Sequence, residues 1–167
     1  MALSSITAYN VSVFIHVTAV VVGFGATFAE SIAFPIVTRT SVRHLPYLHQ
    51  LQIAINRWLA TPALVVVLVT GIYQVSKGNW SFSHFWISAT FVILIVLGGL
   101  NGAYFVPADK RLGAMAEREL AAVPAGTEPT LTDLSAEYQQ GMRTEGIAGA
   151  IAGLLIVVAI FLMVVKP

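Results

Sequence analysis

The sequence IHVTAVVVGFGATFAESIAFP, residues 15–35, is apolar enough to cross a lipid bilayer, yet it contains a histidine, His16, and a carboxylate, Glu30. About 20 consecutive apolar residues form a membrane-spanning helix, and an ionisable side chain within such a helix is costly. Of the 167 residues of the chain, 57% are hydrophobic and 10% are charged, whereas a soluble domain has about 25% charged residues. The composition therefore indicates a membrane protein.

Four stretches of this kind predict an all-α fold. We expect a bundle of four transmembrane helices with cytoplasmic helical extensions, in a single integral membrane domain over residues 1–167. The predicted spans cover roughly residues 9–36, 55–76, 83–107 and 145–165. Helices are expected because they satisfy their backbone hydrogen bonds within one segment, and the runs lack the alternation of barrel strands. Pro62 falls within the second span, or at its start, and predicts a kink or break there.

Positive charge sets the predicted orientation. Seven of the nine lysines and arginines lie in or beside two loops, the one between the first two spans and the one between the last two. The positive-inside rule places both loops in the cytoplasm and both termini outside. A net charge of +1 gives no indication of nucleic-acid binding, and the chain has no cysteine for disulfides or thiolate sites. The lipid bilayer is the expected partner.

His16 and Glu30 share one helical face but cannot touch. They are 14 residues apart, which is close to four turns of 3.6 residues. At 1.5 Å per residue they are separated by about 21 Å along the helix axis. With the predicted orientation, His16 lies in the outer half of the membrane and Glu30 lies near the inner end. We therefore expect two separate sites, or two separate structural contacts.

The histidines are the candidate ligands. A neutral imidazole binds haem iron, zinc or copper, and His84 begins the third span on the same outer side as His16. A haem b between the first and third spans would use His16 as one axial ligand and His84 as the other. In the alternative, His16 hydrogen-bonds to a neighbouring helix and His84 sits at the membrane surface. His44 and His49, five residues apart, are expected to be solvated or capping residues.

Glu30 requires a partner, because a buried carboxylate is paired or protonated. Arg57 opens the second span and Arg143 precedes the fourth, both on the predicted inner side. We expect a buried ion pair between Glu30 and one of these arginines. The functional alternative is a proton relay or an entry point for cations, in which Glu145 would lie beside Glu30 on the predicted inner side.

Three motifs resemble a known family. They are HVTAVVVGFGATF (16–28), NRWLATPALVVVLVTGIY (56–73) and LNGAYFVPADKRL (100–112). Together they resemble the CopD-like (copper-resistance D) superfamily and, within it, a branch of predicted bacterial integral membrane proteins. The resemblance implies a helical bundle in a prokaryotic plasma (inner) membrane. It also implies kinship with copper-uptake proteins and with HemJ-type protoporphyrinogen oxidases, a haem-b group whose first-span histidine corresponds to His16.

Two departures from these relatives narrow the prediction. The HemJ-type proteins carry a lysine in the third span, and here no lysine lies between His84 and Asp109. This argues against protoporphyrinogen oxidation. The chain has only four methionines and no cysteine, so the soft ligands of a Cu(I) path are missing.

Three functions are consistent with these features. The first is a haem-b-binding or redox-associated membrane protein, an accessory subunit for electron transport, with His16 as the metal ligand. The second is a transporter for a metal ion or small solute, with Glu30 on the path. The third is a structural or assembly subunit without cofactor, which docks other membrane subunits or a second copy through small-residue faces. Pairs such as Gly98 with Gly102 and Gly149 with Gly153 supply those faces.

Overall fold

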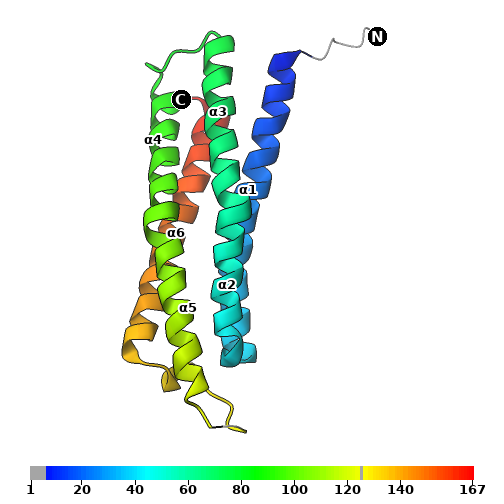
Figure 1. Ribbon diagram of the computed structural model, residues 1–167. Helices are drawn as coiled ribbons and strands as arrows, with labels where there is room; N and C mark the ends of the chain where they lie inside the picture. Colours follow the sequence, from blue (N-terminus) through cyan, green and yellow to red (C-terminus); the bar gives the residue numbers. More distant parts are fainter. Residues whose placement is uncertain (1–6, 125) are drawn as a thin grey trace.

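The computed structural model describes residues 7–124 and 126–167, and these residues form four long helical rods with no strand among them (Figure 1). The rods and their connections, in chain order, are α1 (Ala8–Thr40), η1 (Val42–His44), α2 (Leu45–Ile55), η2 (Asn56–Ala60), α3 (Thr61–Lys77), α4 (Phe85–Leu100), η3 (Asn101–Phe105), α5 (Val106–Ala121), η4 (Leu131–Asp133) and α6 (Ala136–Val165). Four helices are long and apolar enough to cross a membrane: Ala8–Thr40, Val42–Lys77, Phe85–Ala121 and Ala136–Val165. The predicted all-α fold with four spans is confirmed.

The surface of the rods is apolar, as a lipid-facing surface must be. Phe14, Ile95 and Val164 are 70%, 68% and 75% exposed, and many other large hydrophobic side chains are similarly uncovered. In water such a surface would be an aggregation hazard, whereas in lipid it incurs no hydrophobic penalty. The exposed apolar surface therefore supports the membrane location independently of sequence composition.

Two of the rods contain a widened, π-helical turn at matching sequences. NRWLATPA (56–63) and NGAYFVPA (101–108) both begin with a buried asparagine and carry a proline six residues later. In each case the backbone N–H before the proline donates five residues back, from Thr61 to Asn56 and from Val106 to Asn101. Proline lacks an N–H and its ring clashes with the carbonyl four residues earlier. The wide turn absorbs this conflict, so that each rod continues beyond its proline.

The two wide turns lie against one another. The Asn101 side-chain amide donates to Thr61 Oγ1 at 3.0 Å, which joins η3 to the start of α3. Turns of this kind disrupt regular hydrogen bonding and often occur at functional sites.

The end of the bundle that contains α2, α5 and the beginning of α6 has the best-packed apolar core. Its fully buried members include Leu45, Leu112, Ala116 and Tyr138. We call this half of the bundle the inner half, following the predicted orientation, and the half around His16 the outer half. The orientation itself stays a prediction from the charge pattern.

The connection before α6 is held by hydrogen bonds as well as by the packing of Leu131 and Leu134 against the apolar core. Ser135 caps α6 by accepting from the Tyr138 N–H, and its own N–H and hydroxyl donate to Glu119 at 2.8 and 2.7 Å. In η4, the N–H and hydroxyl of Thr130 donate to Asp133, and these bonds lower the pKa of the Asp133 carboxyl. These contacts set where α6 enters the bundle.

Candidate functional site

Three fully buried polar side chains form a continuous row in the inner half. His49 on α2 meets Asp109 on α5, with 2.9 Å between Nδ1 and Oδ1, and its Nε2 lies 3.0 Å from the hydroxyl of Tyr138 on α6. His49 and Asp109 are each only 1% exposed, and Tyr138 is fully covered. Buried polar groups are tolerated when they are hydrogen-bonded. Both ring nitrogens of His49 are therefore satisfied, each by a different helix.

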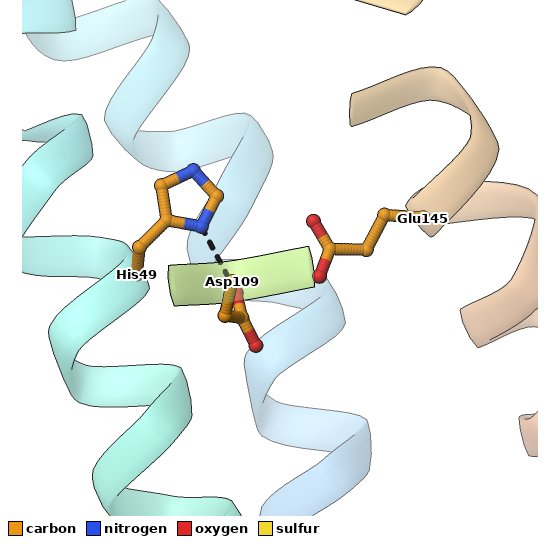
Figure 2. A group of neighbouring side chains, drawn as sticks. All are labelled: His49, Asp109 and Glu145. Atoms are coloured by element: carbon orange, nitrogen blue, oxygen red, sulfur yellow. Dashed lines mark hydrogen bonds and ion pairs between the residues drawn. The ribbon is translucent and has the colours of Figure 1, made fainter. Parts of the chain in front are cut away.

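Glu145 brings a second carboxylate to this row. Its ligand atom and those of His49 and Asp109 all lie within 4.8 Å of one another. Figure 2 shows the Glu145 side chain extending from its helix toward Asp109, on the side opposite His49. The three residues come from α2, α5 and α6. We call His49, Asp109 and Glu145 the inner cluster.

The inner cluster has a donor set that suits a divalent metal ion. One imidazole nitrogen and two carboxylates are ligands for zinc, iron or manganese. Two ligand atoms on bonds of about 2.1 Å that meet at a right angle are about 3 Å apart. The 2.9 Å between His49 Nδ1 and Asp109 Oδ1 is close to this octahedral spacing, whereas the tetrahedral angle usual for zinc gives about 3.4 Å. A metal ion bound by both atoms would lie to one side of the line that joins them and would replace their hydrogen bond.

Close helix packing positions the cluster. Gly113 lies one turn after Asp109 on the same helix, and a Cβ placed there would come within 3.1 Å of the His49 Cβ. The absence of a side chain at Gly113 lets α5 approach α2 closely, because glycine is the residue that permits such approach. The approach is what brings Asp109 within hydrogen-bonding distance of the imidazole.

Several buried oxygen atoms near the bundle axis have no hydrogen-bond donor among the described residues. They are Glu30 Oε1, Gln52 Oε1, Asn101 Oδ1 and Glu145 Oε1. All four are acceptors, and they come from α1, α2, η3 and α6. An unpaired buried acceptor costs about 1–3 kcal/mol. A cation, a proton or a water molecule bound between the helices would satisfy them.

Glu30 does not form the ion pair that the sequence predicts. Between the described residues, the ion pairs are Arg43 with Glu128 and His49 with Asp109. Arg57 is exposed and lies over the ring of Trp58, 5.5 Å from its centroid. Arg143 is also exposed, in a surface groove that it lines together with Gln139 and Ile147. Both arginines point away from the bundle axis because extending a guanidinium to the surface avoids its desolvation.

His16 lies in a different place, in the outer half. Its Nδ1 is 2.7 Å from the hydroxyl of Thr70 on α3, so the predicted hydrogen bond to a neighbouring helix is present. The ring also lines a cavity of about 270 Å³ whose walls belong to α1, α3, α4 and α6. We call this space the His16 cavity. The separation of His16 from Glu30 into two sites agrees with their spacing along α1.

His84 is not brought to His16. It precedes α4 in an exposed turn, where its Nδ1 lies 2.8 Å from the carbonyl of Ser81, and it does not line the His16 cavity. Its ring packs edge-on against Trp80, with 5.8 Å between centroids. The two histidines proposed as a pair of ligands therefore belong to different environments.

The residue that sequence reasoning misjudged is His49. We expected it to be solvated or to cap a helix, whereas it is buried at the centre of the inner cluster. The available signal was the helical spacing of Leu45 and Leu48 around it, which indicates a buried face. Asp109 gave a similar signal, since Leu112 and Ala116 continue its face and both are buried.

Comparison with known proteins gives one match. A family model described as predicted integral membrane protein (DUF2269) matches residues 10–167. No curated protein and no solved structure matches the chain. The family match supports the membrane fold and does not extend to the CopD-like superfamily.

Proposed function

The chain belongs to the DUF2269 family of predicted integral membrane proteins, and from this premise we propose that it binds a divalent metal ion at the inner cluster and passes it through the bundle. The observation that carries the proposal is the meeting of His49, Asp109 and Glu145, whose ligand atoms lie within 4.8 Å of one another inside a membrane protein. Buried charges are normally paired or coordinate a metal.

When Asp109 and Glu145 are both ionised, charge balance favours a cation at this position. Asp109 and Glu145 provide two carboxylates, and the carboxylate of Glu30 lies close enough to interact with them electrostatically. Against these, His49 supplies at most one positive charge. A divalent ion would neutralise the cluster without a buried arginine. Because the imidazole binds in its neutral form and the carboxyl groups bind as carboxylates, metal binding would weaken as the pH falls.

Transport, rather than permanent storage, is supported by the unpaired acceptors. Three protein ligands leave at least one coordination position open, as in sites that exchange ligands. Glu30 Oε1 on α1 and Asn101 Oδ1 on η3 are buried acceptors, and neither has a hydrogen-bond donor among the described residues. They offer hard oxygen ligands along the interior. Glu30 is thus our candidate for the cation path or for a proton relay linked to it.

Purified protein is expected to bind one Zn²⁺ per chain, with Mg²⁺ bound far more weakly because imidazole prefers transition metals. Glu145→Gln should lower the Zn²⁺ affinity by about 100-fold or more, since even the loss of an indirect contact to a metal ligand costs about 10–100-fold. Equilibrium dialysis with elemental analysis measures both. Glu137→Gln, an exposed acid on the first turn of the same helix, is the matched control.

Transport is tested separately, in proteoliposomes loaded with a Zn²⁺ indicator. Glu30→Gln should abolish uptake while leaving the binding of one Zn²⁺ intact. Zn²⁺ binding that is absent from the native protein, or equal in Glu145→Gln and native protein, would refute the metal site. Unchanged uptake in Glu30→Gln would remove Glu30 from the path.

Haem b is a second candidate ligand, for the His16 cavity, because an imidazole lines an apolar space there. The fit is incomplete. His84 does not line the cavity, and no lysine or arginine is present among its described lining residues to pair with the propionates. The volume of about 270 Å³ also lies near the lower end of the sizes of small-molecule sites, about 300–1,000 Å³, whereas haem is a large ligand. We therefore rank haem second and derive no chemistry from it.

An absorption spectrum of the purified protein, oxidised and reduced, tests this second candidate. Bound haem with His16 as ligand predicts a Soret band that is lost in His16→Ala. A spectrum without a Soret band after expression in haem-sufficient cells would exclude haem. We also propose, from the sequence, that the protein lies in a prokaryotic inner membrane. Its partners there would be other membrane subunits or a second copy of the chain.

A further inference from the structure

The His16 cavity is almost entirely apolar and is lined by two polar side chains, those of His16 and Thr90. Apart from His16 and Thr90, the described residues that line it are apolar or glycine. The Thr90 hydroxyl donates its one proton to the Trp86 carbonyl at 2.7 Å, so toward a ligand it can only accept. A binding site typically combines apolar walls with a few placed polar groups. In this cavity the placed groups are the imidazole and the oxygen of the Thr90 hydroxyl, and the imidazole nitrogen is the more basic acceptor.

Hydrogen bonding determines which atom of the imidazole is free. The Thr70 hydroxyl donates to the Val66 carbonyl at 2.6 Å, and a hydroxyl has only one proton to donate. At its 2.7 Å contact with His16, Thr70 Oγ1 must therefore accept, so His16 Nδ1 carries the ring proton. Within an apolar span the neutral imidazole is favoured. His16 Nε2 is then the unprotonated ring nitrogen, which can accept a hydrogen bond.

The shape of the cavity suits a flat ring. Phe24 and Phe91 contribute aromatic walls. Gly71 lies between the two rings, since a Cβ there would be in ordinary contact with His16 Cε1 and Phe91 Cζ, both at 3.6 Å. Aromatic side chains pack favourably against other rings in offset or edge-on arrangements. The volume of about 270 Å³ accommodates a ligand smaller than haem.

The cavity opens toward the lipid. Three of its lining residues, Val17 on α1 and Ile160 and Val164 on α6, are 53%, 42% and 75% exposed. In a bilayer these side chains face acyl chains, so the mouth lies between α1 and α6. A ligand would enter from the membrane rather than from water.

We propose that the His16 cavity binds a lipid-soluble aromatic alcohol, a molecule of the phenol or quinol class, whose hydroxyl donates to His16 Nε2. An acyl chain would fill the apolar space but leave the imidazole without a donor. An aromatic ring that carries a hydroxyl suits both the apolar, aromatic walls and the imidazole acceptor. This site is independent of the inner cluster and of metal binding there.

The test uses a tritiated, diazirine-bearing phenol as a photolabel, with the full-length protein in nanodiscs. Labelled residues are mapped by mass spectrometry, and labelling is competed with 4-tert-butylphenol or with its methyl ether, 4-tert-butylanisole. The ether keeps the ring and lacks the donor. At equal concentrations in the bilayer, the phenol should compete at least about fivefold better, the effect of one hydrogen bond. Labels should map to residues of the His16 cavity.

Two substitutions at His16 separate hydrogen bonding from folding. His16→Leu should bring the preference for phenol over ether to about one, while His16→Gln should restore it, because the amide oxygen can accept. Ala159→Phe, which fills the cavity from α6, should abolish the labelling that the phenol or the ether can compete. Size-exclusion behaviour and helicity establish that each variant is folded, and only folded variants enter the comparison.

Other outcomes overturn the proposal. Equal competition by phenol and ether in native protein would show an apolar space filled by lipid only. Labels outside the cavity, or a preference for phenol that survives in folded His16→Leu, would remove His16 from the role. A haem Soret band lost in His16→Leu would show that the cavity holds haem instead.

Discussion

Replacing Asp109 by leucine is expected to reduce the free energy of unfolding by about 3 kcal/mol. The substitution removes the partner of His49 Nδ1, which is 2.9 Å from Asp109 Oδ1 in a fully buried position. A polar group left unpaired in the interior bears its full desolvation cost. The effect should be measured by SDS-titrated unfolding in mixed micelles without added metal, followed by tryptophan fluorescence.

Asp109→Asn is the matched variant for this experiment. Its amide oxygen can still accept from the His49 N–H, so most of the stability should return, whereas Zn²⁺ binding should stay weak because the negative charge is gone. The pair of variants thus separates the structural role of Asp109 from its role as a ligand. Equal stability of Asp109→Leu and native protein would show that the row is not important for the fold.

Replacing Gly23 by alanine is expected to destabilise the protein by about 1–3 kcal/mol, the cost of overpacking a tight contact. Gly23 is buried where α1 crosses α3, and an added Cβ would overlap the Cβ of Ala63. Both atoms belong to short side chains attached to helix backbone, so neither can rotate away. Relief would require the two helices to separate.

Gly25→Ala is the internal control, because a Cβ at Gly25 meets nothing within 4 Å. It should be neutral or slightly stabilising, since alanine is the better helix former. Adding Ala63→Gly to Gly23→Ala should recover part of the lost stability, and a double-mutant cycle would give the coupling. Similar stabilities for Gly23→Ala and Gly25→Ala would disprove the close contact.

The two sites were predictable to different degrees. His16 was recognised from its sequence alone, because an imidazole in a long apolar run is unusual wherever the helix packs. Its hydrogen-bond partner Thr70 lies 54 residues away in the sequence. Because many other hydroxyl side chains could have served, the sequence did not identify this partner. For Glu30, we expected an arginine partner from proximity along the predicted inner side, but Arg57 and Arg143 are exposed.

The widened turns are another feature that sequence patterns only partly indicated. Pro62 predicted a kink or a break in the second span, and the structure instead has a π-helical turn before it. The same turn recurs before Pro107. A proline indicates that the regular hydrogen-bond pattern must change, while the neighbouring helices determine how the rod responds.

By itself the sequence determined that this chain has four helices long and apolar enough to cross a membrane. Long apolar runs leave the backbone no water to bond with, and a helix satisfies those bonds locally, so no knowledge of neighbours is needed. Only the tertiary structure decided that His49, Asp109, Tyr138 and Glu145 meet. They lie on three helices, and their meeting depends on the rotation and spacing of those helices. Rotation and spacing are set by contacts such as Gly113 against His49, which involve residues far apart in the chain.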